Sequence, residues 1–469
     1  MKVLVAAAEA LPYFKTGGLA EVARSLPDAL RGRNLDVRII LPAYAESRVQ
    51  GGSAEREADL VVPWVDGPVR VGCQLHRPGP RRAPAVLLDQ PRFFGVAQPY
   101  GAPGESRGTL AQRFAFFSRA IVAYAARWGA DVVHLNDWQT GLVPIYGLLD
   151  GWESASVFVI HNLPYQGNFP PEMLSAIGIP GSFYRTENGV EFYGQLSFAK
   201  AGIALADRLV TVSPTYALEI QTPEFGAGLD GLLRFRRRVL HGILNGVNPE
   251  EWDPASDSSL AATYDADNLA GKDENRAAVL AQLGLEEGGP LLVMVTRLAH
   301  QKGMSLLLDA LPQLLASHVR MAVLGDHGPD YHDALVGWEA HAPGRFAARF
   351  AFDDRLAHRL YAGGDFFLMP SLYEPCGLGQ LIAQRYGTPP IVRHTGGLAD
   401  TVEDGKTGFA FEPQNAPALA EAVARATAAW RTAGWTPLRR RCMRLDRSWS
   451  RSARNYEQVY RLATGRISA

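Results

Sequence analysis

The sequence has few cysteines, no long apolar run and no surplus of positive charge, and each absence excludes a class of protein. Its three cysteines, Cys73, Cys376 and Cys442, lie far apart and form no CxxC pair, which argues against a zinc site and a disulfide framework. No apolar run reaches the roughly 20 residues that span a bilayer. The formal net charge is -1, so a nucleic-acid partner is not expected. These features predict a cytoplasmic protein with no nucleic-acid or membrane partner.

The apolar start of the chain is interrupted by Glu9, and a glycine-rich loop with Lys15 follows. This pattern favours a first buried strand over a signal peptide. The length of 469 residues exceeds what one hydrophobic core organises, so we expect two domains. We place the boundary after Asn245, giving an N-terminal domain of residues 1–245 and a C-terminal domain of 246–469, whose final helix could pack back on the first.

Short apolar runs alternate with amphipathic stretches in both halves. This alternation predicts an α/β fold of two doubly wound, Rossmann-like domains with parallel sheets and an interdomain cleft. Helices are expected at Leu19–Arg31 and Met304–Leu315, and a hinge at the start of Asn248–Gly289. The predicted strands are Lys2–Ala7, Asp36–Leu41, Asp131–His134, Ser156–His161, Arg208–Val212, Leu291–Thr296, Met321–Leu324, Arg345–Phe350, Asp365–Met369 and Pro390–Val392. The Pro-rich region from Ala58 to Arg92 differs, and we expect it to insert a few antiparallel strands.

The octapeptide KTGGLAEV begins at Lys15, in the loop after the first predicted strand. The glycines Gly17 and Gly18 allow backbone N–H groups to approach an anion at a helix N-terminus, and Lys15 adds a positive charge. A tight strand-to-helix turn with a surface lysine is the alternative. The whole octapeptide favours an anion site.

This octapeptide resembles the N-terminal signature of bacterial glycogen synthases and plant starch synthases. The resemblance continues nearly to the end of the chain through HLNDWQTGLVP, VIHNLPYQG, TVSPTYALEIQTPEFGAGLDGLLR, ILNGVNPEEWDP, TRLAHQKG, EPCGLGQL and HTGGLADTVEDGKTGF. It implies the GT-B fold of two facing Rossmann-like domains, in agreement with the alternation of strands and helices. It also implies that Lys15 binds the phosphates of a nucleotide sugar.

Two motifs in the first half end predicted strands. In the first, Asp137 could bind sugar hydroxyls and Trp138 could stack on a sugar face. The alternative is a strand terminus at which Asn136 and Asp137 cap the next helix. The resemblance places Asp137 in the active site. It also places His161, within His161-Asn162, beside the donor glucose, and Asn245 on the sugar. Asn245 could alternatively be only a turn residue within Asn-Gly.

Two motifs in the second half carry the remaining candidates. Arg297 and Lys302 follow a strand, where they would stabilise the charge that grows on a leaving diphosphate. After the predicted strand Asp365–Met369, the resemblance implies that Glu374 binds glucose hydroxyls. The turn that follows would open a helix towards phosphate, and consists of Cys376, Gly377, Leu378 and Gly379, of which Gly379 replaces a threonine common in the family. Cys376 is interpreted as a small packed residue.

Phe352 has two interpretations: an aromatic against the adenine, as the resemblance implies, or a core residue. The resemblance implies retaining transfer of glucose from ADP-glucose to the non-reducing end of an α-1,4-glucan. No carboxylate in the motifs fits a nucleophile's role. No cofactor and no metal are expected, because Lys15, Arg297 and Lys302 can neutralise the diphosphate.

The alternatives to this function are a sucrose- or trehalose-type synthase, a phosphorylase and a non-catalytic glucan-binding scaffold. Preference for ADP- or UDP-glucose, acceptor length, oligomeric state and regulation stay open.

Overall fold

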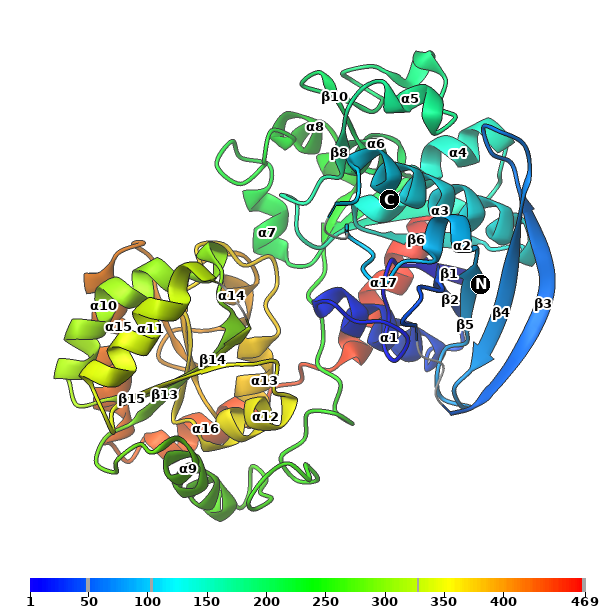
Figure 1. The fold of residues 1–469 in the computed structure, drawn as a ribbon. Helices are drawn as coiled ribbons and strands as arrows, with labels where there is room; N and C mark the ends of the chain where they lie inside the picture. The colour runs from blue at the N-terminus through cyan, green and yellow to red at the C-terminus, as the bar shows by residue number, and fades with distance from the viewer. Residues whose placement is uncertain (48–50, 102–103, 327–328, 466–469) are drawn as a thin grey trace. The chain divides into compact units, whose positions relative to one another are not determined.

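The computed structural model describes residues 1–47, 51–101, 104–326 and 329–465, which form two compact units (Figure 1). Unit 1 comprises Met1–Asn245 and Trp449–Ala469, and unit 2 comprises Gly246–Ser448. Each unit is built on its own parallel or mostly parallel sheet. Within the described ranges, no helix combines the length and the apolar character needed to cross a membrane.

The described residues of unit 1 form a nine-stranded sheet of order β12-β11-β7-β6-β1-β2-β5-β4-β3. Neighbours from β12 to β5 pair in parallel, whereas β4 and β3 are antiparallel at one edge. The antiparallel insertion is thereby confirmed, although it begins earlier than predicted. The strands are β1 (Lys2–Ala6), β2 (Asp36–Pro42), β3 (Ser53–Val62), β4 (Val69–Arg77), β5 (Ala85–Asp89), β6 (Val132–Asn136), β7 (Ala155–Ile160), β11 (Arg208–Thr211) and β12 (Leu240–Gly242).

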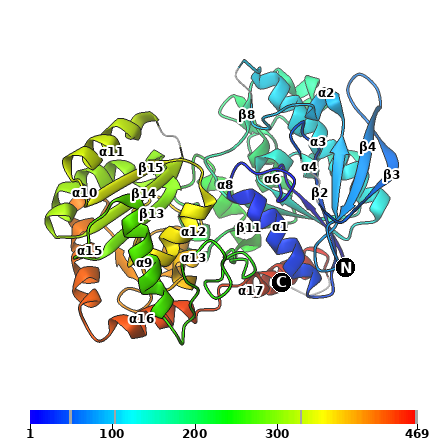
Figure 2. The same cartoon turned by 60° about the horizontal axis from the view of Figure 1, so that its bottom comes forward.

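Helices cover both faces of this sheet. Successive side chains of β1 point to opposite faces, and because they are apolar both faces have to be buried. Leu4 and Ala6 join the core under α3 (Arg107–Trp128). Val3 and Val5 join the core that α1 (Gly18–Arg31) and α17 (Trp449–Ala463) complete. Figure 2 shows α17, in red, beside α1, in blue. A helix from the far end of the described chain therefore closes one face of unit 1.

Smaller elements of unit 1 follow the main strands. A three-stranded sheet of order β8-β10-β9 lies among them. These elements are α2 (Pro91–Phe94), α4 (Val143–Asp150), β8 (Asn168–Phe169), α5 (Met173–Ala176), β9 (Glu191–Phe192), β10 (Gln195–Ser197), α6 (Phe198–Leu205), α7 (Pro214–Glu219) and α8 (Asp230–Phe235).

Unit 2 contains, among its described residues, a six-stranded sheet of order β15-β14-β13-β16-β17-β18, with every neighbouring pair parallel. The strands are β13 (Leu291–Arg297), β14 (Arg320–Asp326), β15 (Phe346–Phe350), β16 (Phe366–Met369), β17 (Pro390–Arg393) and β18 (Phe409–Phe411). The helices are α9 (Ala270–Leu283), α10 (Met304–Ala316), α11 (Pro329–His341), α12 (Asp354–Gly363), α13 (Gly379–Arg385), α14 (Gly396–Thr401), α15 (Ala416–Trp430) and α16 (Trp435–Met443).

The predicted strands and the two predicted helices agree with observed elements to within two residues at each end. The short strands β12 and β18 were not predicted, nor was α9, which lies inside the segment expected to begin with the hinge. In both sheets the strands that follow the first one are added on one side of it, and the later strands are added on its other side. The order reverses between β1 and β6 in unit 1, and between β13 and β16 in unit 2. Ligands of open α/β sheets bind at such switch points, outside the carboxyl ends of the strands.

Candidate active site

The loop that leaves β1 is held by the buried carboxylate of Glu9. This carboxylate accepts hydrogen bonds from the backbone N and the Oγ1 of Thr16, at 2.5 and 2.6 Å. Burial raises the pKa of Glu9 above its ordinary value. Lys15 Nζ lies 2.9 Å from Glu21 Oε1 on the first turn of α1, so the predicted phosphate-binding cation is paired with a carboxylate. Gly17, the residue before α1, has an extended backbone, and its conformation alone does not require glycine.

Asp137 follows β6 at the switch point of unit 1. Its φ of 55° and ψ of −175° lie in a region that is essentially restricted to glycine, where another residue stores about 1–3 kcal/mol of strain. Its Oδ1 accepts the backbone N–H of His161 at 2.8 Å. Burial raises the pKa of Asp137 to about 7, and the charge of Glu9 adds to the shift. A strained, poorly solvated carboxyl at a switch point is typical of a functional residue.

His161 follows β7, the neighbour of β6. Its Nε2 lies 2.7 Å from Oδ1 of Asn136, and burial lowers its pKa to about 3. The amide oxygens of Asn162 and Asn245 are buried without a protein hydrogen-bond partner among the described residues. Buried acceptors without donors are rare, and a hydroxyl-rich ligand or water would satisfy them. The structure therefore brings Glu9, Asp137 and His161 together, whereas no contact joins Asn245 to them.

We expect Asp137→Asn to raise the melting temperature by a few degrees above about pH 7 and to lower activity. The folded-state pKa of about 7 exceeds the ordinary value of 3.8, so the folded state binds more protons between these values. Stability therefore falls as pH rises through this window. Asparagine keeps the shape and an acceptor for His161 N–H without the buried charge. Melting curves at pH 4 to 8 should show a smaller decline in the variant.

Asp137→Ala is the matched control for that experiment. It also removes the charge but loses the acceptor, so it should gain less stability than Asp137→Asn. Equal slopes of melting temperature against pH in wild type and Asp137→Asn would contradict the assignment of this titration to Asp137.

In unit 2, the residues after β13 and β16 meet at the other switch point. Lys302 Nζ lies 2.7 Å from Oε2 of Glu374, and Ser371 Oγ donates to the same oxygen at 3.0 Å. Glu374 is only 5% exposed. The sequence predicts a phosphate role for Lys302 and a sugar role for Glu374, and in the structure the two side chains form one ion pair. Arg297 is exposed at the end of β13.

The turn after Glu374 is packed through its glycines. Gly377 has a φ of 74°, which disfavours other residues. A Cβ on Gly379 would lie 2.9 Å from the Phe367 ring, so the family's threonine would not fit here without a shift. The helix predicted to open within Gly377–Gln380 is α13, which begins at Gly379 with Leu378 before it. Cys376 is a buried free thiol, consistent with the packing interpretation.

The two aromatic residues of the predicted site, Phe352 and Trp138, differ in their exposure to solvent. Phe352 is 68% exposed in the loop after β15, which excludes the core interpretation. Trp138 is buried, with its ring against those of Phe114 and Phe169. The prediction that Trp138 could stack on a sugar is therefore wrong, because its side chain is only 9% exposed and belongs to the core of unit 1.

The sequence motifs did not single out three residues that contribute to these clusters: Glu9, Asn136 and Gly397. Glu9 had a signal, since it interrupts an apolar strand just before the glycine-rich loop. Asn136 lies inside a recognised motif, but nothing in the spacing indicates that it bonds His161. Gly397, in the motif HTGGLAD, donates its backbone N–H to the carbonyl of Glu374 at 3.0 Å. Its missing Cβ leaves room for the backbone of Cys376, only 2.2 Å from where that atom would lie.

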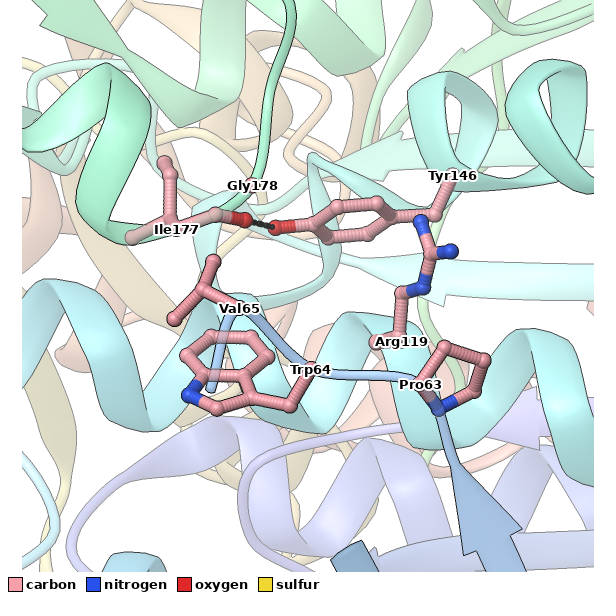
Figure 3. A pocket seen from close by; sticks show the side chains of 7 residues that line it. All are labelled: Pro63, Trp64, Val65, Arg119, Tyr146, Ile177 and Gly178. Carbon is pink, nitrogen blue, oxygen red and sulfur yellow. Dashed lines mark hydrogen bonds between the residues drawn. The ribbon is translucent and has the colours of Figure 1, made fainter. Parts of the chain in front are cut away.

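Two cavities lie elsewhere. Figure 3 shows one of about 150 Å³ in unit 1, beside which Tyr146 OH donates to Ile177 O at 2.6 Å. Another, of about 540 Å³, lies in unit 2 between the segments around Trp252, Asp265–Asp267 and Met443–Ser448. None of the predicted site residues lines either cavity. The candidate site is therefore assigned from the polar clusters at the switch points.

Comparison with known proteins gives a consistent family. Residues 2–235 match the starch synthase catalytic domain, and residues 289–428 match glycosyl transferases group 1. The chain is 44% identical to a glycogen synthase of Syntrophotalea carbinolica and 45% identical to one of Alkalilimnicola ehrlichii, with 99% of each chain covered.

Solved structures agree. The catalytic domain of starch synthase IV from Arabidopsis thaliana, bound to ADP and acarbose, matches with a TM-score of 0.89 and 31% identity over 99% of both chains. A sucrose-phosphate synthase from Thermosynechococcus elongatus, at 20% identity and a TM-score of 0.63 over 99% of this chain and all of that one, shares the fold. On the strength of relatives matched along its whole length, this chain belongs to the glycogen synthase and starch synthase family of glycosyltransferases with the GT-B fold.

Proposed function

We propose that this chain is a glycogen synthase that transfers glucose from ADP-glucose to the non-reducing end of an α-1,4-glucan, with retention and release of ADP. The observation that carries the proposal is the full-length likeness to a starch synthase that binds ADP and acarbose. The polar clusters at both switch points support it, since each lies where open α/β sheets bind ligands. A cytoplasmic location fits a soluble donor of this kind.

Each unit has its own part in the proposal. In unit 1, which we assign to the acceptor side, Asp137 and His161 contact the transferred sugar and Asn162 and Asn245 accept its hydroxyls. Lys15, with Gly17 and Gly18, binds donor phosphate. To do so, Lys15 gives up its ion pair with Glu21 and pairs with the phosphate. In unit 2, the donor side, Glu374 binds glucose hydroxyls, Phe352 packs against the adenine, and the turn Cys376–Gly379 faces the diphosphate.

The reaction we propose uses positioning and electrostatics. The acceptor hydroxyl attacks from the face that the diphosphate leaves, and the leaving phosphate takes the proton of that hydroxyl. Arg297 and Lys302 stabilise the negative charge that develops on the diphosphate, and this stabilisation grows as the bond breaks. The same cations stand in for a metal ion, so the proposal requires neither metal nor cofactor.

We expect kcat/KM for ADP-glucose to exceed that for UDP-glucose. The motivation is the bacterial-type KTGGLAEV motif together with the ADP-bound relative. The measurement is transfer of labelled glucose from either donor onto glycogen, side by side and with and without EDTA. A higher kcat/KM for UDP-glucose would reverse the donor assignment, and binding of glycogen without transfer from either donor would favour the non-catalytic scaffold.

A further inference from the structure

A chain of buried hydrogen bonds joins His161 to α17. His161 Nε2 lies 2.7 Å from Asn136 Oδ1, and His134 Nε2 lies 3.2 Å from the same oxygen. His134 Nδ1 lies 2.8 Å from the hydroxyl of Tyr460 on α17. Asn136, His134 and Tyr460 are each at most 1% exposed. In such surroundings each proton position is fixed by which partner can accept it.

The orientation of the Asn136 amide is set by strand β1. Its Nδ2 donates to the carbonyl oxygen of Ala6 at 2.9 Å. If the amide were reversed, two oxygens would face each other at that distance, and both hydrogens of the amide would point at imidazole nitrogens. A carbonyl can only accept, so Ala6 requires the nitrogen on its side. The amide oxygen therefore faces both histidines.

One amide oxygen facing two imidazoles determines both tautomers. Since Oδ1 has no proton to give, Nε2 of His161 and Nε2 of His134 both donate. In neutral His134 the other ring nitrogen is then an acceptor, and the hydroxyl of Tyr460 supplies its hydrogen. Burial lowers the pKa of His134 to about 4 and that of His161 to about 3, so both rings are neutral at physiological pH.

We propose that Asn136, held by Ala6 and by the His134–Tyr460 pair, is a positioning residue that fixes His161 as its neutral Nε2–H tautomer, leaving Nδ1 as an acceptor for a hydroxyl of the transferred sugar. The part concerning the sugar rests on the proposed function. Among the described residues, Nδ1 of His161 has no hydrogen-bond partner. In this tautomer Nδ1 offers its lone pair as an acceptor and has no proton to donate.

A neutral acceptor suits a reaction in which positive charge develops on the sugar. An imidazolium at His161 would repel that charge, whereas a neutral ring accepts a hydroxyl hydrogen without opposing it. His134 is the titratable group coupled directly to this ring. Asp137, whose Oδ1 accepts the backbone N–H of His161, lies next to it, and Glu9 is coupled to Asp137. Burial keeps the ring uncharged, and the hydrogen bond to Asn136 decides which nitrogen of the uncharged ring carries the proton.

The test reads the tautomer directly, by long-range ¹H–¹⁵N correlation spectra of the whole chain labelled with ¹⁵N-histidine. Spectra of His161→Asn and His134→Asn assign the two rings. We expect a protonated Nε2 and an unprotonated Nδ1 for both, unchanged between about pH 5.5 and 8. A proton on Nδ1 of His161, or titration of its ring within that range, would overturn the proposal. This readout does not depend on glucose transfer, so it fails separately from the proposed function.

Variants then test the positioning role. Asn136→Ala should mix the two tautomers of His161 and lower kcat about tenfold, with a smaller change in the KM for the donor. Tyr460→Phe should disturb the His134 signals and lower kcat about two- to tenfold. Tyr456→Phe, one turn away on α17, is the matched control, because it keeps the ring that lies 5.4 Å from the His134 ring; it should leave the tautomer of His134 and kcat unchanged. If Asn136→Ala melts like wild type and keeps a single Nε2–H tautomer, Asn136 does not position His161. If it does not fold, Tyr460→Phe and the wild-type spectra decide.

Discussion

Glu374→Ala is expected to lower kcat/KM by at least about ten- to a hundredfold while changing the melting temperature little. A hydrogen bond to a charged group contributes about 1.5–3 kcal/mol, and about 1.4 kcal/mol corresponds to tenfold in rate. Glu374 is nearly completely buried and presents one carboxylate to Lys302 and Ser371. Losing it would remove the contacts that we propose it makes to the sugar, and it would leave Lys302, whose side chain is 17% exposed, without this carboxylate.

The measurement is steady-state kinetics with thermal melts on the same preparation. Glu339→Ala is the matched control, since it removes a glutamate of unit 2 that is paired with Arg349 at 2.9 Å and lies outside the site. The control should keep wild-type kcat. If Glu374→Ala turned over like wild type and melted normally, the assignment of this motif to the donor sugar would be wrong.

Arg297→Ala and Lys302→Ala are expected to lower kcat by about a hundredfold each, more than they raise KM. Removing one group that stabilises developing negative charge typically costs this much. Arg297 is exposed, so its replacement should leave stability unchanged and give the cleaner measurement. Lys302→Ala also leaves Glu374 buried without its cation, which adds a stability cost.

A double-mutant cycle separates the two roles of Lys302. Because Lys302 and Glu374 form one ion pair, the double variant should lose less activity than the two single losses combined. If Arg297→Ala and Lys302→Ala kept wild-type kcat and changed only KM, the cations would bind ground state and transition state equally. The electrostatic account of the leaving group would then have to be abandoned.

The sequence predicts the alternation of strands well because buried parallel strands are continuous apolar runs, as in Leu291–Arg297. It also predicts which motifs lie at the switch points of the sheets, because they follow the ends of those strands. It does not predict the pairing of Lys15 with Glu21 or of Lys302 with Glu374, since such contacts depend on side-chain direction in three dimensions. Trp138 shows the same limit: its place in the motif cannot distinguish a residue facing a ligand from one facing the core.

Unit 1 is assembled from both ends of the described chain, and this has a consequence for biosynthesis. Residues up to Asn245 leave the ribosome first, yet the core around Val3 and Val5 stays open until α17 supplies Tyr456 and Tyr460. All of unit 2 is made in between, so it can complete its own core earlier. A nascent chain stalled before Trp449 should therefore hold a protease-resistant unit 2 beside a still accessible unit 1. The order of maturation is then the reverse of the order of synthesis.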